Sequence, residues 1–215
     1  MKVLVIGANG KIGKHIVSKL AASNKHEVRA MVRDESQREE LEKRGGEVVI
    51  ADLEKDFSHA FEGCHAAIFT AGSGAHTGPD KTELVDRQGA MKAVDLAKEH
   101  QIARFLIVSS MNADTPDNGP ESMKHYYKAK GDADHHLQAS GLNYTIVRPG
   151  RLSLDPATGK IEASDKIENR GSRDIPREDV AEVMIASLDH ENTYNRTFEI
   201  LSGDVPIGQA LTSLQ

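Results

Sequence analysis

Two side chains in the second half of the sequence have the types and spacing that suit proton transfer. Tyr126 and Lys130 lie four residues apart within ESMKHYYKAKGDADHHLQASG, so on a helix they share one face. A lysine ammonium close to a phenol favours the phenolate and lowers the pKa of the tyrosine, which prepares it for acid–base work at neutral pH. Tyr127 is a competing candidate one position off the face of Lys130. The alternative is a packed tyrosine beside a surface lysine.

A glycine-rich turn near the start of the chain has a spacing that suits phosphate binding. In MKVLVIGANGKIGKHIV, the residues Gly7, Gly10 and Gly13 follow a short apolar run and precede an amphipathic one. Glycines between a strand and a helix let the backbone approach a pyrophosphate, whose charge the N–H groups at the helix start bind. The spacing is G-x-x-G-x-x-G rather than G-x-G-x-x-G. We expect a dinucleotide here; the alternative is a tight turn without a ligand.

The residue after the second apolar run indicates which dinucleotide binds. Units that bind NAD place an acidic residue there, about 20 residues beyond the glycines, to hold the ribose hydroxyls. This sequence has Arg33 at that position, and Asp34, one residue later, should point elsewhere. A guanidinium pairs with a 2′-phosphate, whereas a carboxylate repels it. We therefore expect NADP(H) to be preferred, with NAD(H) possible; the alternative is that Arg33 is a solvated residue at a strand end.

The elements that position these residues alternate regularly along the chain. Short apolar runs at 2–6, 27–32, 47–51, 66–70, 104–109, 144–148 and 197–201 lack strict alternation, which is typical of strands buried on both faces of a parallel sheet. Helical patterns fall at 11–22, about 35–44, about 82–100, about 123–139 and 178–188. The alternation predicts an α/β fold of the Rossmann type: a doubly wound, mostly parallel sheet of about seven strands, with helices on both faces. The expected strand order is 3-2-1-4-5-6, with the seventh strand at the edge.

Polar, irregular segments at 72–81 and 151–174 both follow predicted strands. They should lie at the carboxyl edge of the sheet, where open α/β folds bind ligands. We therefore expect a single NAD(P)-binding domain over residues 1–215, with a small substrate-side elaboration around 151–175. VSSMNA places Ser109 and Ser110 at the same edge, near the expected position of a substrate carbonyl.

Composition narrows the class of protein. The chain has 215 residues and a net charge of −6, which argues against nucleic acid as a partner. No apolar run approaches the roughly 18 residues of a membrane span. Because the sequence opens on a strand-like run, we expect no cleaved leader. Cys64 is the single cysteine, which indicates a reducing, cytoplasmic setting. Ten histidines form no compact ligand pattern, so we expect no metal. The expected partner is a small-molecule substrate, and the expected state is a monomer or homodimer.

Taken together, these motifs resemble a known family over nearly the whole chain. GANGKIGKHIV, VRAMVRD, ADL, VSSM, YYKAKGDADHHLQASGLNYTIVRPG and IPREDVAEVM are similar to the small atypical short-chain dehydrogenase/reductases related to the NAD-dependent epimerase/dehydratase branch. The resemblance implies that Tyr126 is the acid–base group and Lys130 its partner, with Lys130 also contacting the cofactor. Epimerase-like relatives place a serine or threonine where this chain has Met111. The resemblance therefore implies either that Ser110 supplies the catalytic hydroxyl or that this hydroxyl is missing.

The resemblance also implies a set of cofactor contacts. The glycine turn contacts the pyrophosphate, Arg33 the 2′-phosphate, Asp52 and Leu53 the adenine, and Pro149 and Gly150 the nicotinamide. The full expected set is Gly7, Asn9, Gly10, Lys11, Ile12, Gly13, Arg33, Asp52, Leu53, Ala71, Gly72, Ser109, Lys130, Pro149 and Gly150.

The expected function is an NADP(H)-dependent oxidoreductase that acts on a small carbonyl, alcohol or quinone-like substrate. One alternative is an NAD(P)-dependent epimerase or isomerase, although the segment after the sixth predicted strand is short for a nucleotide sugar. Another is a noncatalytic NADP(H)-binding redox sensor or regulatory protein. Arg148, at the end of the sixth strand, is a candidate anchor for an anionic substrate or a member of a structural ion pair.

Overall fold

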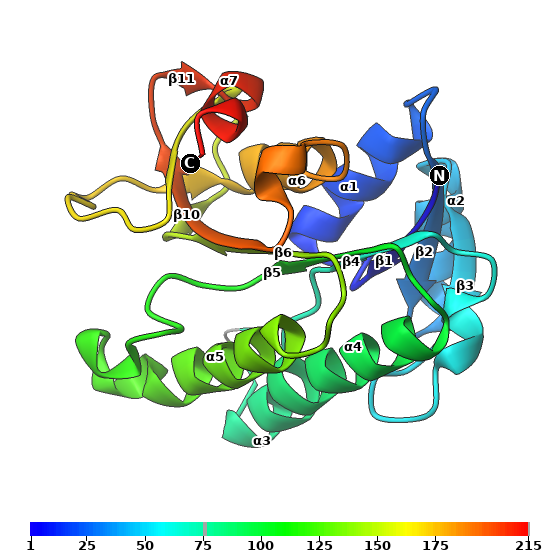
Figure 1. Cartoon of the computed structure of the whole chain (residues 1–215). Coiled ribbons are helices and arrows are strands. Elements are labelled where there is room, and N and C mark those ends of the chain that lie inside the picture. Colours follow the sequence, from blue (N-terminus) through cyan, green and yellow to red (C-terminus); the bar gives the residue numbers. More distant parts are fainter. Residues whose placement is uncertain (75–76, 215) are drawn as a thin grey trace.

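A nine-stranded sheet forms the centre of the molecule in the computed structural model, which describes residues 1–74 and 77–214 (Figure 1). The strand order is β11-β8-β10-β6-β5-β4-β1-β2-β3. The parallel strands are β1 (Lys2–Ile6), β2 (Glu27–Val32), β3 (Glu47–Ile50), β4 (Ala66–Phe69), β5 (Arg104–Val108), β6 (Tyr144–Pro149) and β10 (Arg196–Ser202). The antiparallel additions are β8 (Lys160–Ser164) and β11 (Val205–Pro206). A separate two-stranded sheet joins β7 (Leu152–Ser153) to β9 (Ile175–Pro176).

Helices cover both faces of this sheet. The α-helices are α1 (Lys11–Ala21), α2 (Arg38–Lys43), α3 (Pro79–Lys81), α4 (Ala90–Glu99), α5 (Lys124–Gln138), α6 (Arg177–Ala186) and α7 (Ile207–Thr212). A π-helical segment (Thr82–Gly89) joins α3 to α4, and short 3₁₀ turns cover 35–37, 58–61, 116–118, 121–123 and 191–193. Figure 1 shows α4 and α5 below the sheet and α1 and α6 above it.

The apolar core lies in two layers, one on each face of the sheet. Strand β1 shows why: Val3 and Val5 pack in the layer that contains α1 and α6, whereas Leu4 and Ile6 pack in the layer that contains α4 and α5. All four side chains are completely buried. A strand buried on both faces has no polar side, which explains the unbroken apolar run in the sequence.

The predicted α/β class is confirmed, and the order β3-β2-β1-β4-β5-β6 matches the expected 3-2-1-4-5-6. The predicted position of the seventh strand is wrong. Strand β10 pairs with β6, but β8 pairs with its other side and β11 lies beyond β8, so the sheet has nine strands. Strand β8 lies within the segment 151–174, for which the sequence predicts irregular structure. Apolar and polar residues alternate too weakly over its five positions to predict a strand.

Two further features bear on the sequence predictions. The expected helix at about 82–100 is continuous, but its first two turns are π-helical. The polar segment 72–81 includes Ala75 and His76, which lie outside the described residues. Within residues 1–74 and 77–214, the structure contains no helix long and apolar enough to cross a membrane and no group of three or more side chains suited to hold a metal ion.

Candidate active site

The glycine turn between β1 and α1 is built so tightly that side chains are excluded from it. Gly7 has a φ of +85°, and a Cβ there would lie 2.5 Å from the backbone nitrogen of Ala71, after β4. A Cβ on Gly13 would lie 2.4 Å from the carbonyl oxygen of Gly7. Both atoms in the way are backbone, so glycine is required at these two positions.

The start of α1 is open to an anion. Gly10 is its N-cap and donates its N–H to the carbonyl of Gly7 at 2.9 Å, but it offers no side-chain cap. The first turn carries no acidic residue, and Lys11 is exposed there. The N–H groups of the first turn and the positive end of the helix dipole are therefore available to a phosphate. The predicted contact residues Asn9 and Ile12 flank this turn.

The two charged residues after β2 have different roles in the structure. Asp34 is the N-cap of the following 3₁₀ turn, where its Oδ1 accepts the N–H of Ser36 at 2.8 Å. That bond is the main reason why the pKa of Asp34 lies below its ordinary value. Arg33 is exposed, and no hydrogen bond or ion pair within the described residues engages its guanidinium. The carboxylate is thus held by its own turn while the cation faces solvent at the end of the strand.

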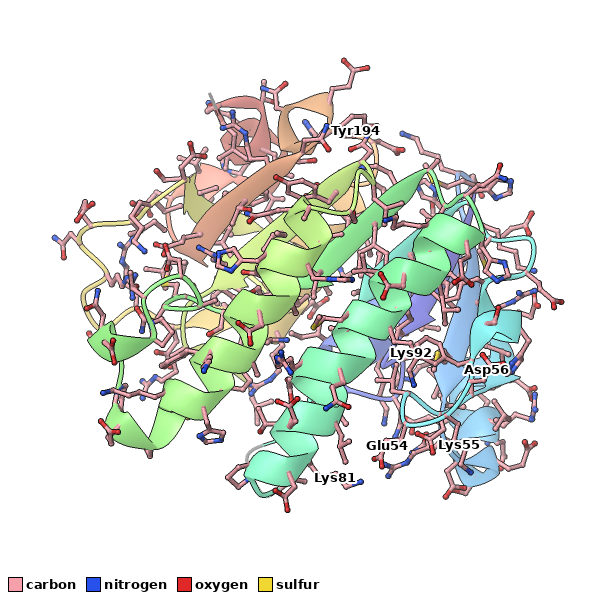
Figure 2. The ribbon with its side chains drawn as sticks, turned by 60° about the horizontal axis from the view of Figure 1, so that its bottom comes forward. Glu54, Lys55, Asp56, Lys81, Lys92 and Tyr194 are labelled. Carbon is pink, nitrogen blue, oxygen red and sulfur yellow. The ribbon has the colours of Figure 1, made fainter. Side chains whose placement is uncertain are left out.

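The loop after β3 is held against the helices that follow β4. Lys92, on α4, donates to the carbonyls of Leu53 and Lys55 at 3.1 and 3.0 Å, and Lys81 pairs with Glu54 (Figure 2). A Cβ on Gly89 would lie 3.2 Å from Cβ of Leu53, so the π-helical segment packs directly on this loop.

The predicted adenine contact Asp52 lies in the same loop. Its Oδ1 accepts the N–H of Glu54 at 3.0 Å, within the loop itself. Asp52 is half-buried at the carboxyl end of β3, next in the sheet to β2 and Arg33.

Tyr126 and Lys130 share one face of α5, and a third residue joins them. The Lys130 ammonium lies 5.9 Å from the centre of the Tyr126 ring and 3.7 Å from Oδ1 of Asp86, which the π-helical segment carries. Asp86 is completely buried, and Lys130 is 3% exposed. The second carboxylate oxygen of Asp86 accepts the N–H of Ser73 at 3.0 Å, while Oδ1 has no hydrogen-bond partner among the described residues.

Burial decides the protonation of the pair. Burial raises the pKa of the Tyr126 phenol, and the Lys130 ammonium offsets only part of that effect. The net shift is upward, against the direction expected from the spacing alone, because desolvation outweighs the neighbouring charge. Burial on its own lowers the pKa of Lys130, but Tyr126, when ionised, together with Asp86 and Asp134 reverses the shift and raises it. At neutral pH the phenol therefore holds its proton and the amine is charged.

The serines at the end of β5 are occupied by internal hydrogen bonds. Ser109 is 3% exposed and donates its hydroxyl to Asp134 at 2.8 Å. Ser110 donates its hydroxyl to the carbonyl of Met111 at 3.1 Å. Met111 is buried in a small apolar cluster with Ile167 and Leu201.

The end of β6 packs against the loop that follows β5. Pro149 accepts the N–H of Met111 at 3.1 Å, and a Cβ on Gly150 would lie 2.4 Å from the Leu201 side chain and 3.4 Å from the Met111 sulfur. The structure thus brings the loop after β5 and the end of β6 together. Gly72, on the opposite side, packs closely on Asp86.

The span from residue 7 to residue 191 matches the protein family described as NAD(P)H-binding. This span contains the start of α1, the Tyr126–Lys130 pair, and the carboxyl ends of β5 and β6. The chain belongs to this NAD(P)H-binding family. The predicted resemblance to the atypical short-chain dehydrogenase/reductases is confirmed with it.

Relatives within and around this family carry epimerase and reductase names. YhfK of Bacillus subtilis, an uncharacterized sugar epimerase, is 50% identical over 217 residues that cover 100% of both chains. A solved structure from Bacillus halodurans, provisionally named an NAD-dependent epimerase/dehydratase, is 47% identical, with a TM-score of 0.96 and 100% coverage of both chains. The sanguinarine reductase of Eschscholzia californica is 28% identical over 256 residues, covering 98% of this chain and 92% of the reductase.

Two buried carboxylates of this NAD(P)H-binding chain were not anticipated as site residues. Asp86 lies in a helical pattern that the sequence marks only as amphipathic, and Asp134 lies two turns after Tyr126 on the same helix. The Asp134 carboxylate accepts two bonds from Arg148, at 2.9 and 3.0 Å, besides that of Ser109. Arg148 also pairs with Asp114 at 3.2 Å, so of its two expected roles the structure gives it the ion pair.

The buried ammonium of Lys130 depends on the carboxylate of Asp86 as its counter-charge, which a substitution can test. Asp86→Asn keeps the shape and the acceptor for Ser73 but leaves the buried ammonium without its nearest counter-charge. We expect a loss of about 3 kcal/mol in the free energy of unfolding at neutral pH. The difference in unfolding free energy between the two proteins should narrow at alkaline pH. In the wild type the pKa of Lys130 is raised, so stability is lost as the pH rises through it. In the variant we expect burial to lower the pKa of Lys130, so stability is gained as the ammonium loses its proton.

Chemical denaturation of wild type and variant across the pH range measures this. Asp95→Asn is the matched control on α4, because Asp95 pairs with His136 but is 56% exposed. It should cost less than about 1 kcal/mol. Equal losses for the two variants would show that the buried pair has no special weight.

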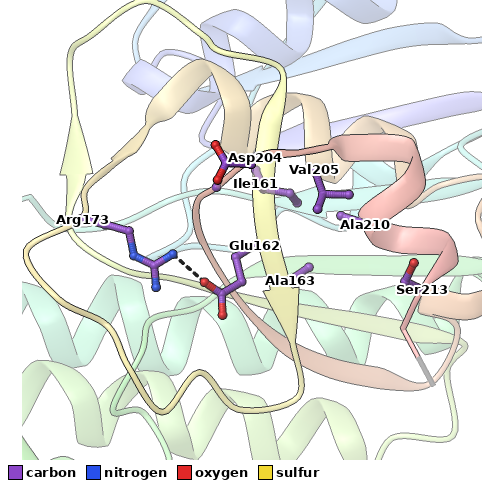
Figure 3. A pocket seen from close by; sticks show the side chains of 9 residues that line it. Ile161, Glu162, Ala163, Arg173, Asp204, Val205, Ala210 and Ser213 are labelled. Carbon is purple, nitrogen blue, oxygen red and sulfur yellow. Dashed lines mark hydrogen bonds and ion pairs between the residues drawn. The ribbon is translucent and has the colours of Figure 1, made fainter.

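One cavity lies away from the site around Tyr126 and Lys130. It holds about 310 Å³ beside β8 and α7 and is lined by residues that include Glu162, Arg173 and Ser213 (Figure 3). None of the residues expected to contact cofactor or substrate lines it. The site at the carboxyl ends of β1, β4 and β5 is therefore distinguished by its polar groups rather than by the size of a cavity.

Proposed function

We propose that this protein is an NADP(H)-dependent oxidoreductase that reduces a small carbonyl or quinone-like compound. The observation that carries the proposal is the geometry of α5, where the ammonium of the buried Lys130 lies 5.9 Å from the centre of the Tyr126 ring. A phenol that holds its proton at neutral pH, next to a fixed ammonium, is a proton donor suited to an oxygen that gains negative charge. Membership of the NAD(P)H-binding family implies a nicotinamide dinucleotide, which delivers or accepts a hydride when bound.

The residues present fit such a dinucleotide. The turn at Gly7 and Gly13 leaves backbone where side chains would otherwise be, and the first turn of α1 offers uncapped N–H groups to the pyrophosphate. Arg33 is exposed and unpaired among the described residues at the end of β2, where it would pair with a 2′-phosphate. Asp52 and Leu53 would border the adenine, Ala71 and Gly72 the ribose, and Pro149 and Gly150 the nicotinamide.

The side chains of the chain then have separate tasks during reduction. Tyr126 donates its hydroxyl proton to the carbonyl oxygen as negative charge builds up there. Lys130 stabilises the phenolate that remains, because its ammonium is fixed by Asp86. In the opposite direction, the phenolate accepts the proton of an alcohol.

Activity measurements distinguish the reductase from two alternatives. An epimerase would use the same residues in both directions on one bound substrate, as the name of YhfK suggests for that protein, whereas the sanguinarine reductase carries the name of a net reduction. A noncatalytic redox sensor would bind NADPH without turnover. Steady NADPH consumption with a panel of quinones, aldehydes and ketones supports the reductase; tight NADPH binding with no turnover on the panel overturns it.

Cofactor preference rests on Arg33. We expect Arg33→Ala to weaken NADPH binding by about 10- to 100-fold, the value of one charge-assisted contact, and to leave NADH binding unchanged. Dissociation constants for both cofactors, from quenching or fluorescence titrations, measure the preference. Arg38→Ala is the matched control, since Arg38 is already paired with Glu35 and Glu42. An unchanged NADPH-to-NADH ratio in Arg33→Ala would refute the assignment.

A further inference from the structure

The two serine hydroxyls of the loop after β5 are engaged in internal hydrogen bonds. The Ser109 proton goes to Asp134 and the Ser110 proton to the Met111 carbonyl. Met111, at the position where the family resemblance implies a hydroxyl, is apolar and buried. If the proposed reduction takes place, a group near this loop whose N–H has no internal partner is better suited to bind the carbonyl oxygen beside Tyr126.

Asn112 is a polar side chain of this loop, one residue after Met111. It follows Met111, whose sulfur packs against Gly150, and precedes Ala113, whose carbonyl would lie 2.2 Å from a Cβ on Gly131. The loop therefore lies between the end of β6 and the turn of α5 that carries Lys130. Asn112 is half-buried, and its φ of +68° is a left-handed conformation that costs most residues energy. Asparagine adopts this region more readily than other residues with a side chain.

The orientation of the Asn112 amide is fixed by a partner that can only donate. An arginine N–H lies 2.6 Å from Asn112 Oδ1, and this guanidinium belongs to Arg170 in the substrate-side segment. Because arginine has no acceptor, the amide oxygen must face it and the NH₂ group must face away. Arg170 is itself paired at 3.3 Å with Glu199, which is completely buried in β10. No hydrogen bond of the described residues uses the two N–H groups of Asn112.

We propose that Asn112 donates an amide N–H to the carbonyl oxygen of the substrate, in place of the hydroxyl that Met111 cannot supply. This rests on the proposed function. The amide keeps both its protons. A reduced nicotinamide would supply the hydride to the carbonyl carbon, the π electron pair would move to the oxygen, and that oxygen would take the proton of Tyr126. As charge grows on that oxygen, the hydrogen bond from Asn112 strengthens, so it stabilises the transition state more than the bound substrate.

Two substitutions remove this donor in different ways. Asn112→Gly tolerates the positive φ and keeps the backbone path, whereas Asn112→Asp keeps the acceptor for Arg170 but presents no proton at neutral pH. We expect kcat for NADPH-dependent reduction to fall about 100-fold in both, as when one oxyanion donor is lost. The KM for the carbonyl, the dissociation constant for NADPH and the melting temperature should change little. Asn195→Gly is the matched control: Asn195 also has a positive φ, at 54°, but precedes β10 at the opposite end of the sheet.

The outcomes separate the two proposals. If wild type reduces the panel and Tyr126→Phe does not, while Asn112→Gly and Asn112→Asp keep the wild-type kcat, the role of Asn112 is wrong and the proposed function stands. If wild type reduces no carbonyl, both fail together. If Asn195→Gly loses as much activity as Asn112→Gly, the effect comes from the backbone and the donor role is overturned. A loss of kcat confined to the two Asn112 variants supports it.

Discussion

Tyr126→Phe is expected to lower kcat for carbonyl reduction by about 10³-fold, within the usual range for removal of a general acid. The phenylalanine ring keeps the packing beside Lys130 but has no proton to deliver. Binding of NADPH should be almost unchanged, because the substitution leaves intact the glycine turn and Arg33, which are expected to hold the pyrophosphate and the 2′-phosphate. Steady-state rates and an NADPH titration on the same preparation separate the two effects.

The pH dependence of the wild type follows from the same group. Because burial raises the pKa of Tyr126, the phenol stays protonated through neutral pH. We expect kcat for reduction to stay level there and to fall only on the alkaline side of the ordinary tyrosine value of about 10. Oxidation of an alcohol needs the phenolate, so its rate should rise with pH over the same range. A reduction rate that already falls between neutral pH and that value would contradict the assignment.

The neighbouring tyrosine provides the control for these experiments. Tyr127 packs its ring over the loop before α5, where a Cβ on Gly119 would lie 2.2 Å from the ring carbon Cε2. Its ring centre is 5.8 Å from that of Tyr126, so the two residues share much of their environment. Tyr127→Phe should keep the wild-type kcat. If Tyr127→Phe is inactive and Tyr126→Phe is active, the acid–base role belongs to the other tyrosine.

Gly13→Ala is expected to abolish NADPH binding and to lower the free energy of unfolding by about 3 kcal/mol, as for severe overpacking. The added methyl would lie 2.4 Å from the Gly7 carbonyl oxygen and 2.8 Å from Cα of Ala8. Neither backbone atom can move without shifting α1 relative to β1. The N–H groups that would hold the pyrophosphate shift with it. Equilibrium denaturation and an NADPH titration measure the two losses.

Gly208 gives the control for the cost of a methyl group. It lies in α7, and a Cβ there meets no atom within 4 Å. Gly208→Ala should leave NADPH binding unchanged and stabilise the protein by up to about 1 kcal/mol, because alanine is the better helix former. If Gly13→Ala binds NADPH as tightly as Gly208→Ala does, the glycine turn is not the cofactor site.

The order of the first six strands could be predicted from the sequence because it depends on local, repeated signals. Each strand is a short apolar run followed by a helical pattern, and the handedness of the crossovers restricts the topology. The position of Tyr126 and Lys130 on one helix face is equally local. The antiparallel strand β8 could not be predicted, since only its pairing with β10, more than thirty residues later, makes it a strand.

Parts of the site depend on contacts between distant segments and could not be predicted. Asp86 and Lys130 are 44 positions apart in the sequence, and nothing near Asp86 marks it as a buried counter-ion. The bond between Arg170 and Asn112 spans 58 positions. The direction of the Tyr126 pKa shift also required the structure, because spacing shows the neighbouring charge but not the extent of burial.

The π-helical segment has a consequence for insertions and deletions in this chain. A π-helical turn holds more residues than an α-helical one, so it shifts the angular phase of every side chain that follows. In this segment the π-helical geometry lets Asp86 face Lys130 while Gly89 packs against Leu53. Deleting a single residue between them would let the segment relax to α-helical geometry, which advances about 100° per residue, and one of the two contacts would be lost. The length of this segment is therefore constrained as strictly as its composition.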